Sequence, residues 1–313
     1  MKKILGVLLS VLLFLCFTSC SKRTDNRTVV WASSPEFAQY IELFNSTHPD
    51  NQVILVYKEN PADSIPPARD EAVPDIIVGP FLRSDRTWKD FRSLDYLFDR
   101  QILSSDDFYP QLIDAGRQLY NQYLLPVSFN IPCVMFASEN RGLITNNYTL
   151  SLEQIRNISS NFNQKNKNGA FTKMGFTPLS YQGFPYLVSK LYGTGFHQEK
   201  GIVVYSYPSL KKTVEYLRDW SVTENESVQV EDDFAYKYLF MPDYRQVTSG
   251  RCLFSYTTSD ELFRYMNDES EEIDYRWIYQ GDSIPMEDSF VMMGIYKKSE
   301  NIPGATEFIS WFL

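Results

Sequence analysis

The stretch Leu124-Leu-Pro-Val-Ser-Phe-Asn-Ile-Pro-Cys-Val-Met-Phe136 decides how the rest of this chain is arranged. It is extended and apolar, but Pro126 and Pro132 interrupt it. Each proline fixes φ, removes a backbone donor and pushes the preceding residue toward extended geometry. A central strand of a parallel sheet would be a continuous Val/Ile/Leu run without prolines. We therefore expect two short strand halves with a polar joint.

The joint consists of Ser128, Phe129 and Asn130, which supply a hydroxyl, an aromatic ring and an amide. Such a joint suits a hinge whose side chains contact a ligand. These thirteen residues alone fit a second interpretation equally well, namely a loop followed by an edge strand.

The first twenty residues have the pattern of an export signal. Lys2 and Lys3 precede an apolar run, Ile4 to Phe17, that is short for a membrane span. The Thr-Ser-Cys that follows resembles a lipobox, so we expect cleavage before Cys20, acylation of its new N-terminus and attachment to a bilayer. Phe17 departs from the usual Leu, and an ordinary signal peptide with a chance cysteine is the alternative.

Composition excludes several function classes. The net charge of −9 becomes −11 when Lys2 and Lys3 leave with the signal, and a surface this acidic repels phosphate backbones, so no nucleic-acid partner is expected. His48 and His197 lack metal-ligand spacing, and no catalytic motif is evident, so we expect no metal, no cofactor and no enzymatic activity. Cys133 and Cys252 are predicted either to pair or to remain buried thiols.

Hydrophobic periodicity predicts strands alternating with helices, and hence a mostly parallel sheet with ligands at the carboxyl ends of its strands. Ser34 as N-cap and Pro35 at the first helical position predict the first helix. The other expected helices are 106–119, one opened by Ser151, 185–192, 209–220, 260–266 capped by Ser259, and one from Ala305 to Phe312. The expected strands are 28–31, 53–57, 75–79, 251–257, 275–279 and 290–296.

Five stretches in order resemble the maltose-binding-like family of extracellular solute-binding proteins, the capture subunits of ABC importers. They are Val30-Trp-Ala-Ser-Ser-Pro-Glu36, Pro74-Asp-Ile-Ile-Val-Gly79, Tyr123-Leu-Leu-Pro-Val-Ser-Phe-Asn130, Gly250-Arg-Cys-Leu-Phe-Ser-Tyr256, and Met293-Gly-Ile-Tyr-Lys-Lys-Ser299 with Ala305 to Leu313.

The resemblance implies an α/β, two-lobed, periplasmic-binding-protein-like fold with discontinuous lobes joined by hinge strands. Residues 21–127 with 290–313 would form lobe I, and residues 128–289 would form lobe II. Members of the family usually continue well past the helix that ends here at Leu313, so the C-terminal part is expected to be shortened or the sequence to be a piece of a longer one.

Sites for sugars combine aromatic faces with planar polar groups. Strand ends and the polar joint supply the candidates, each weighed against a structural role such as capping or core packing. The predicted ligand-binding residues are Ser33, Ser34, Glu36, Phe81, Arg83, Ser128, Phe129, Asn130, Tyr181, Gln182, Tyr256 and Thr257.

The predicted function is capture of a small solute, with a sugar or oligosaccharide as the expected ligand, by hinge closure of two lobes. The protein would be an exported, membrane-anchored lipoprotein facing the periplasm or the cell exterior. Its partners would be ABC permease subunits and, through acylated Cys20, the lipid bilayer. The alternatives are a secreted glycan-active hydrolase and a surface lipoprotein that uses the same fold for sensing or adhesion.

Overall fold

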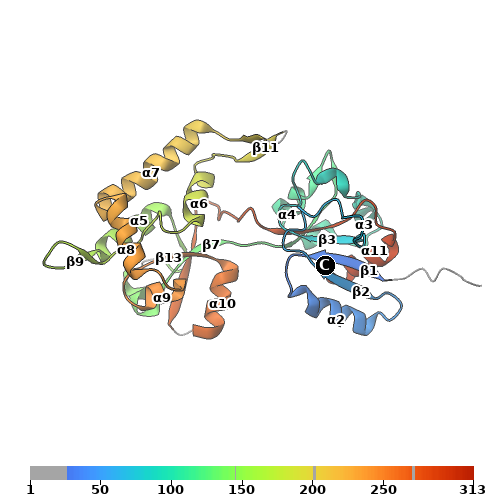
Figure 1. Ribbon diagram of the computed structural model, residues 1–313, viewed down its shortest axis with the longest axis horizontal. Coiled ribbons are helices and arrows are strands. Elements are labelled where there is room, and N and C mark those ends of the chain that lie inside the picture. Colours follow the sequence, from blue (N-terminus) through green and yellow to red (C-terminus); the bar gives the residue numbers. More distant parts are fainter. Residues whose placement is uncertain (1–26, 145, 200–201, 270–271) are drawn as a thin grey trace, which may run out of the picture. The chain divides into compact units, whose positions relative to one another are not determined.

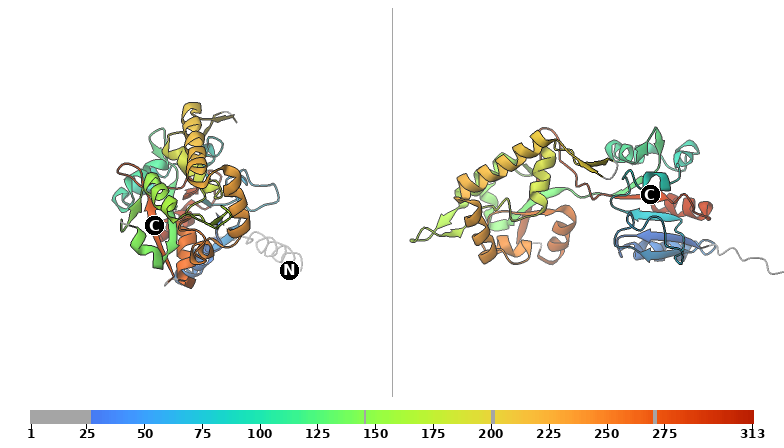
Figure 2. Two further views of the ribbon diagram at one scale, coloured as in Figure 1. Left: turned by 90° about the vertical axis from the view of Figure 1, so that its left-hand side faces the viewer. Right: turned by 45° about the horizontal axis from the view of Figure 1, so that its top comes forward.

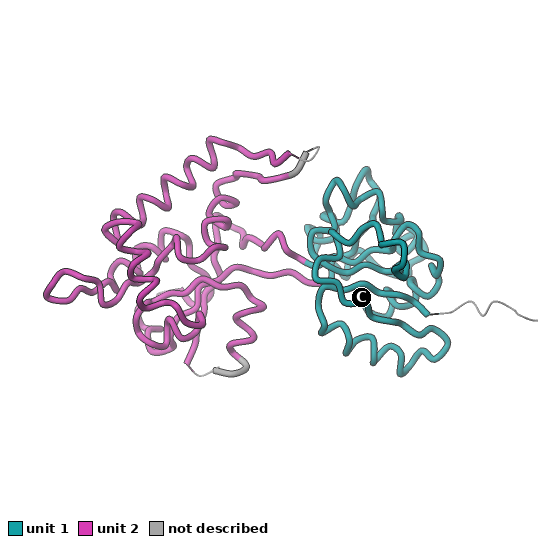
Figure 3. Tube along the Cα trace, viewed as in Figure 1, with its two compact units in different colours: residues 1–127, 291–313 teal, residues 128–290 magenta. Residues whose placement is uncertain are grey.

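The computed structural model describes residues 27–144, 146–199, 202–269 and 272–313. The expected signal peptide and Cys20 lie outside the described residues. The chain divides into two compact units (Figure 3): unit 1 comprises residues 1–127 and 291–313, and unit 2 comprises residues 128–290.

Unit 1 is built on a five-stranded sheet in the order β2-β1-β3-β15-β6. Strands β1 (Thr28–Ala32), β2 (Val53–Tyr57) and β3 (Ile76–Gly79) are parallel, whereas β15 (Val291–Ile295) runs antiparallel to β3. The fifth strand, β6, is Leu125–Ser128. Strand β15, from late in the sequence, therefore lies between β3 and β6 in the sheet to which β1 belongs.

Two helices of unit 1, α2 (Phe37–Thr47) and α11 (Ile302–Phe312), pack together (Figure 1). Phe44 contacts Phe308 edge-on, with 5.1 Å between ring centroids. Both rings are fully buried in the core beside the sheet. The remaining elements of the unit are η1 (Trp88–Asp90), α3 (Asp95–Asp99), η2 (Ser105–Asp107), α4 (Pro110–Ala115), β4 (Arg117–Gln118) and β5 (Asn121–Gln122).

Unit 2 contains a four-stranded sheet in the order β13-β7-β14-β8. Strand β7 (Pro132–Ala137) pairs antiparallel with β13 (Ser255–Thr258) and with β14 (Ile273–Ile278), and only β8 (Thr149–Leu150) joins in parallel. The smaller strands are β9 (Gln164–Lys165), β10 (Phe171–Lys173), β11 (His197–Glu199) and β12 (Ile202–Val204). The expectation of a mostly parallel sheet is therefore right for β1 to β3 and wrong for unit 2.

The helices of unit 2 are η3 (Ser138–Leu143), α5 (Leu152–Phe162), α6 (Gly183–Leu191), α7 (Tyr207–Asn225), α8 (Val228–Tyr238), α9 (Asp243–Thr248) and α10 (Ser259–Glu269). The longest, α7, packs against α5, α6 and α8 (Figures 1 and 2). Ser151 begins α5 with a capping box in which its side chain accepts from the Gln154 amide and the Gln154 side chain accepts from the Ser151 amide.

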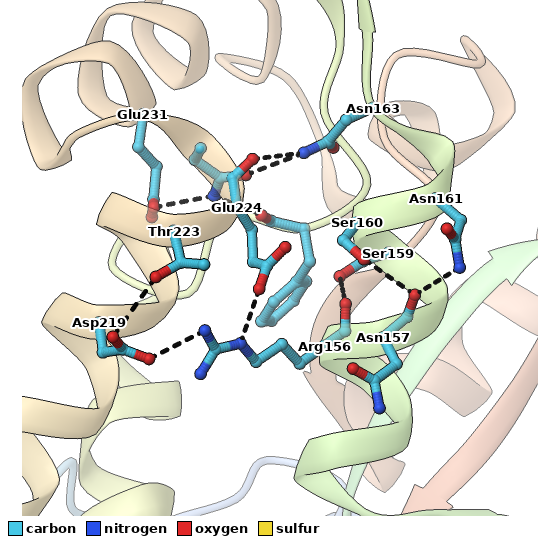
Figure 4. Close-up of polar contacts among 12 residues, drawn as sticks. Arg156, Asn157, Ser159, Ser160, Asn161, Asn163, Asp219, Thr223, Glu224 and Glu231 are labelled. Carbon is cyan, nitrogen blue, oxygen red and sulfur yellow. Dashed lines mark hydrogen bonds and ion pairs between the residues drawn. The ribbon is translucent and has the colours of Figure 1, made fainter.

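A polar network joins α5 to α7 (Figure 4). The guanidinium of Arg156 contacts Asp219 at 2.9 Å and Glu224 at 3.0 Å. Asn163 at the end of α5 donates to the Glu224 carbonyl oxygen at 2.7 Å. Because Arg156 and Glu224 are largely covered, these contacts fix the two helices in register more firmly than surface ion pairs would.

The stretch from Leu124 to Phe136 divides as expected into two strand halves. Strand β6 belongs to the sheet of unit 1, and β7 lies between two partners in the sheet of unit 2, with Pro132 as its first residue. The alternative of a loop and an edge strand is wrong. Pro132 is tolerated because a first strand position needs no internal ladder donor.

Several local predictions are corrected by tertiary contacts. Helix α2 begins at Phe37 with Glu36 as N-cap, because the Ser34 hydroxyl is bonded to Glu36 instead of capping the helix. The single helix expected over 106–119 is wrong: Pro110 starts the short α4 at its first turn, and a hairpin follows.

Two further corrections concern the region around β13. The strand expected from Arg251 begins only at Ser255, because the amides of Leu253 and Phe254 both donate to the Gly175 carbonyl oxygen, at 3.0 and 2.9 Å. Ser259 lies inside α10, and its hydroxyl accepts from the Ile131 amide at 3.1 Å, so it does not act as the expected cap.

The two cysteines within the described part of the chain, Cys133 and Cys252, form no disulfide. Cys133 and Cys252 are fully buried in the same apolar cluster, and burial raises the pKa of both thiols. Of the two possibilities left open by the sequence, the structure has the buried thiols.

Candidate functional site

The carboxyl ends of β1 and β3 lie side by side in unit 1, because Ala32 pairs with Val78. The chain leaves β1 through Ser33, whose amide donates to the Val78 carbonyl oxygen at 3.2 Å. Ser33 and Ser34 are half-buried and Glu36 is exposed. The structure thus brings these three candidates to one edge of the sheet.

Ser34 and Glu36 are bonded to each other at this edge. The Ser34 hydroxyl donates to the Glu36 carboxylate, and the Glu36 amide donates back to that hydroxyl at 3.2 Å. A ligand hydroxyl would therefore meet a carboxylate that already has one donor, which leaves its second oxygen as an acceptor.

The loop after β3 places two other candidates in solvent. Phe81 has a positive φ of 60° and is 59% exposed, whereas the next residue, Leu82, is fully buried. Arg83 is again exposed. Core packing of Phe81, the alternative role, is therefore excluded, and its ring is available as an apolar face.

In unit 2, Asn130 connects three segments of the chain. Its side-chain oxygen accepts from the Ser259 hydroxyl at 3.1 Å, and its backbone carbonyl accepts from the Glu287 amide at 2.9 Å. Ser128 and Phe129, which precede it, are exposed. The side-chain amide nitrogen of Asn130 is the group that a ligand could still accept from.

Tyr256 is 6% exposed, and its hydroxyl donates to the Glu287 carboxylate at 3.1 Å. Its ring packs edge-on against Phe184, and Gly183 is required beside it because an added Cβ would lie 2.9 Å from the ring carbon Cε1. Burial and the carboxylate raise the pKa of Tyr256, so the phenol stays protonated and acts as a donor. Thr257 is buried next to it.

Tyr181 has a mainly structural environment. It is 9% exposed, stacks on Phe176 and donates its hydroxyl hydrogen to Gln246 at 2.8 Å. Its ring lies 6.4 Å from that of Tyr256. Gln182, by contrast, is exposed at the start of α6 and makes no side-chain capping bond.

Four residues near Tyr256 were not among the predicted binding residues: Tyr186, Lys190, Glu287 and Asp288. Lys190 contacts Asp288 at 2.5 Å, and Tyr186 donates to the other oxygen of the same carboxylate, also at 2.5 Å. Burial raises the pKa of Glu287, the fourth residue. The one sequence signal was the spacing of Tyr186 and Lys190, four residues apart on one helix face.

The segment 284–290 is therefore the feature that sequence reasoning missed. In this segment Glu287 meets both Asn130 and Tyr256, residues 126 positions apart in the chain. No pattern within this segment predicts that approach, because the contacts depend on the sheet that holds β7 beside β13.

Among the described residues, no group of His, Cys, Asp and Glu side chains could hold a metal ion. In the same part of the chain, no helix combines the length and the apolar character needed to cross a bilayer. The chemistry that the arrangement offers consists of hydroxyl, amide and carboxylate groups next to aromatic rings. These groups can hydrogen-bond a polyhydroxylated ligand and cover its apolar face.

Comparison with protein-family models and with curated protein sequences finds no match. Solved structures do match. CpMnBP1 with bound mannotriose is similar over 91% of this chain and 77% of its own, with a TM-score of 0.67 and 16% identity. An ABC substrate-binding protein of Listeria monocytogenes in complex with cycloalternan is similar over 91% of this chain and 74% of its own, with a TM-score of 0.64 and 14% identity.

A cyclo/maltodextrin-binding protein complexed with maltotetraose is similar over 93% of this chain and 75% of its own, with a TM-score of 0.63 and 14% identity. These likenesses show that the chain has the two-lobed α/β fold of maltose-binding-like, periplasmic solute-binding proteins. The fold class expected from the sequence is confirmed.

Proposed function

We propose that this protein captures a carbohydrate, in the size range of a disaccharide to an oligosaccharide, as the substrate-binding subunit of an ABC importer. The observation that supports this most is the fold, since the similar structures named above were solved with oligosaccharides bound. The same fold class argues for binding without turnover.

The proposed binding groups come from both units. Unit 1 would contribute Ser33, Ser34, Glu36, Phe81 and Arg83, and unit 2 would contribute Ser128, Phe129, Asn130, Tyr181, Gln182, Tyr256 and Thr257. To these we add Glu287, because it already accepts from Tyr256 and can accept from a sugar hydroxyl with its other oxygen.

Capture would follow from hinge closure of two lobes, with lobe I at 21–127 and 290–313 and lobe II at 128–289. A solute that contacts both lobes binds the closed state better and shifts the population toward it. The lipid anchor at Cys20 and delivery to membrane permease subunits belong to the same proposal, with the protein held at the outer face of a membrane.

A thermal-shift screen tests the proposal, because a ligand that binds only the folded state raises Tm. The chain from Ser21 onward would be tested with mannotriose, maltotetraose, cycloalternan, polyamines and amino acids. We expect at least one saccharide to raise Tm and Asn130→Ala to remove the shift. Asn161→Ala, at an exposed position of α5, is the matched control.

Turnover of the saccharide would contradict the proposal and favour a hydrolase. A response to no compound, together with capture of a protein partner, would favour a sensing or adhesion protein. A saccharide shift that survives Asn130→Ala would support the function and overturn this assignment of the site.

A further inference from the structure

A second surface of unit 1 combines aromatic rings with positive charge. A groove of about 710 Å³ is lined by Asp85, Trp88, Lys89, Phe91, Arg92, Ser93, Gln118, Tyr123 and Lys297. Its rings of Trp88 and Tyr123 meet edge-on at 5.9 Å. Lys89, Arg92 and Lys297 are exposed, and Asp85 is the one carboxylate among the lining residues.

This groove lies at the edge of the sheet opposite to the candidate solute site. Ile295 pairs with Ile76, so Lys297 follows β15 at the amino end of β3. The Tyr296 amide donates to the Asp75 carbonyl oxygen at 2.9 Å, and the Asp75 amide donates to the Val29 carbonyl oxygen at 2.8 Å. The groove therefore shares its edge with the first residues of β1.

The hairpin of β4 and β5 adds an apolar tip beside the groove. Gln118 and Asn121 pair across a turn whose central residues, Leu119 and Tyr120, have φ values of 48° and 72°. A two-residue turn with two positive φ values favours Asn-Gly, and branched or bulky residues there are strained. Yet Leu119 is 82% exposed and Tyr120 is 99% exposed.

The tether expected at the N-terminus would hold this edge close to a bilayer. Cys20 and Thr28 are eight residues apart, which at about 3.3 Å per residue limits the separation to roughly 26 Å. Strand β15 is two strands from β1, or about 10 Å at the usual strand spacing. The groove is thus within reach of a membrane that holds Cys20.

We propose that this surface, formed by Leu119 and Tyr120 at the hairpin tip and Lys89, Arg92 and Lys297 at the groove, docks unit 1 on an anionic phospholipid bilayer. Trp and Tyr favour the bilayer interface, and lysines and arginines attract anionic headgroups. On a chain with a net charge of −9, local positive charge next to an exposed apolar tip fits such a surface. The expected orientation of unit 1 on the bilayer rests on the proposed lipid anchor, whereas the expected affinity of this surface for anionic lipid does not.

The test is co-sedimentation of the chain from Ser21 onward, which cannot be acylated at Cys20, with vesicles. Vesicles of equal parts phosphatidylglycerol and phosphatidylcholine would be compared with phosphatidylcholine alone. We expect binding to the anionic vesicles alone, weakened by salt, and lowered on the order of tenfold or more by the triple variant Lys89→Gln, Arg92→Gln, Lys297→Gln.

The double variant Leu119→Asn, Tyr120→Gly should also lose binding to the anionic vesicles. Its Tm should stay equal or rise, because the introduced Asn and Gly suit positive φ. The matched control is Tyr236→Ser with Phe240→Ser, which removes two rings of unit 2 that are 84% and 92% exposed. This control should bind vesicles as the parent does.

Equal binding to both vesicle types, no binding to either, or binding unchanged by both groove and hairpin variants would overturn the proposal. Capture of free inorganic phosphate or of an acidic protein segment by these residues, without vesicle binding, would also overturn it. Saccharide-induced Tm shifts and mass spectrometry of the acylated N-terminus test the proposed function separately, since neither depends on these five residues.

Discussion

The hydroxyl of Tyr256 donates to the carboxylate of Glu287 at 3.1 Å, and Tyr256 is buried whereas Glu287 is half-buried. The bond joins β13 to the segment that leads back to unit 1, and the Glu287 amide also donates to the Asn130 carbonyl oxygen. A carboxylate held in this way is preorganised as an acceptor, because its orientation is set before a ligand arrives.

The first prediction concerns this pair. Tyr256→Phe removes the donor and leaves the Glu287 carboxylate less restrained, so we expect saccharide affinity to fall by about 5- to 30-fold, which is less than the loss of a direct hydrogen bond to a charged group would cost. Isothermal titration calorimetry with the saccharide found by thermal shift measures the change. Tyr236→Phe, at an exposed position, is the control and should bind as the parent does. An unchanged affinity in Tyr256→Phe would remove this pair from the site.

The second prediction concerns pH. Burial, with a smaller contribution from Glu261, raises the pKa of Asp243 from 3.8 to about 6. The native state therefore holds this proton more tightly than the unfolded state, and the free energy of unfolding falls as pH rises from about 4 to 6. Asp243→Asn keeps the acceptor used by Gln246 and should add about 1–3 kcal/mol at pH 8.

Urea denaturation at a series of pH values between 4 and 8 measures this effect. The free energy of unfolding of the variant should exceed that of the parent by an amount that grows between about pH 4 and 6 and is constant above that range. A difference independent of pH would mean that Asp243 does not titrate there.

The third prediction concerns a buried carboxylate. Glu231 is fully buried and accepts from the Leu179 amide at 2.8 Å and from Asn225 at 3.0 Å. Glu231→Ala leaves both donors without that acceptor and opens a void, so we expect a loss of about 2–4 kcal/mol in the free energy of unfolding. Asp233→Ala, exposed on the same helix, should change it by less than about 0.5 kcal/mol. Equal effects of the two variants would contradict this account.

The fourth prediction concerns close backbone packing at Gly175. A Cβ added there would lie 2.0 Å from the Ser159 carbonyl oxygen, which is backbone and cannot rotate away. Gly175→Ala should destabilise unit 2 by about 3 kcal/mol or more, measured by Tm. Gly142→Ala is the control, because nothing lies within 4 Å of its added Cβ. A Tm of the Gly175 variant within a degree or so of the control would show that the backbone yields there.

The fifth prediction concerns the thiols. Because Cys133 and Cys252 are buried and their pKa values are raised, neither should react with an aromatic disulfide reagent in the native protein. Both should react within the time of unfolding in urea. Intact mass after alkylation in denaturant counts the free thiols at Cys133 and Cys252. A mass that lacks both alkyl groups would indicate a disulfide between them and would contradict this packing.

Some of the fold could be predicted because its signals are local. The capping box at Ser151 and the apolar periodicity of α11 lie within a few residues of each other, so the sequence displays them directly. The division of residues 124–136 into two strands was predicted for the same reason, since Pro126 and Pro132 act on their own neighbours. The parallel order of β1 and β2 followed from the helix α2 between them.

Other features could not be predicted because they depend on partners far along the chain. Nothing near Arg251 indicates that the amides of Leu253 and Phe254 bond to Gly175 and delay the start of β13. Nothing near Ser259 indicates that its hydroxyl serves Asn130 and Ile131. Among the candidate binding residues, the exposure of Phe81 could be expected from its place after a strand, whereas the contacts of Glu287, Tyr186 and Lys190 could not.

The sequence by itself determined that residues 124–136 divide into two strands of different sheets and that polar and aromatic groups follow β1 and β3, because prolines, caps and periodicity act over a few residues. Only the tertiary structure decided that Glu287 meets Tyr256, and that the cations at 89, 92 and 297 line one groove. Those approaches join residues far apart in the chain, and they arise from sheet pairing and core packing, whose energies depend on the whole unit.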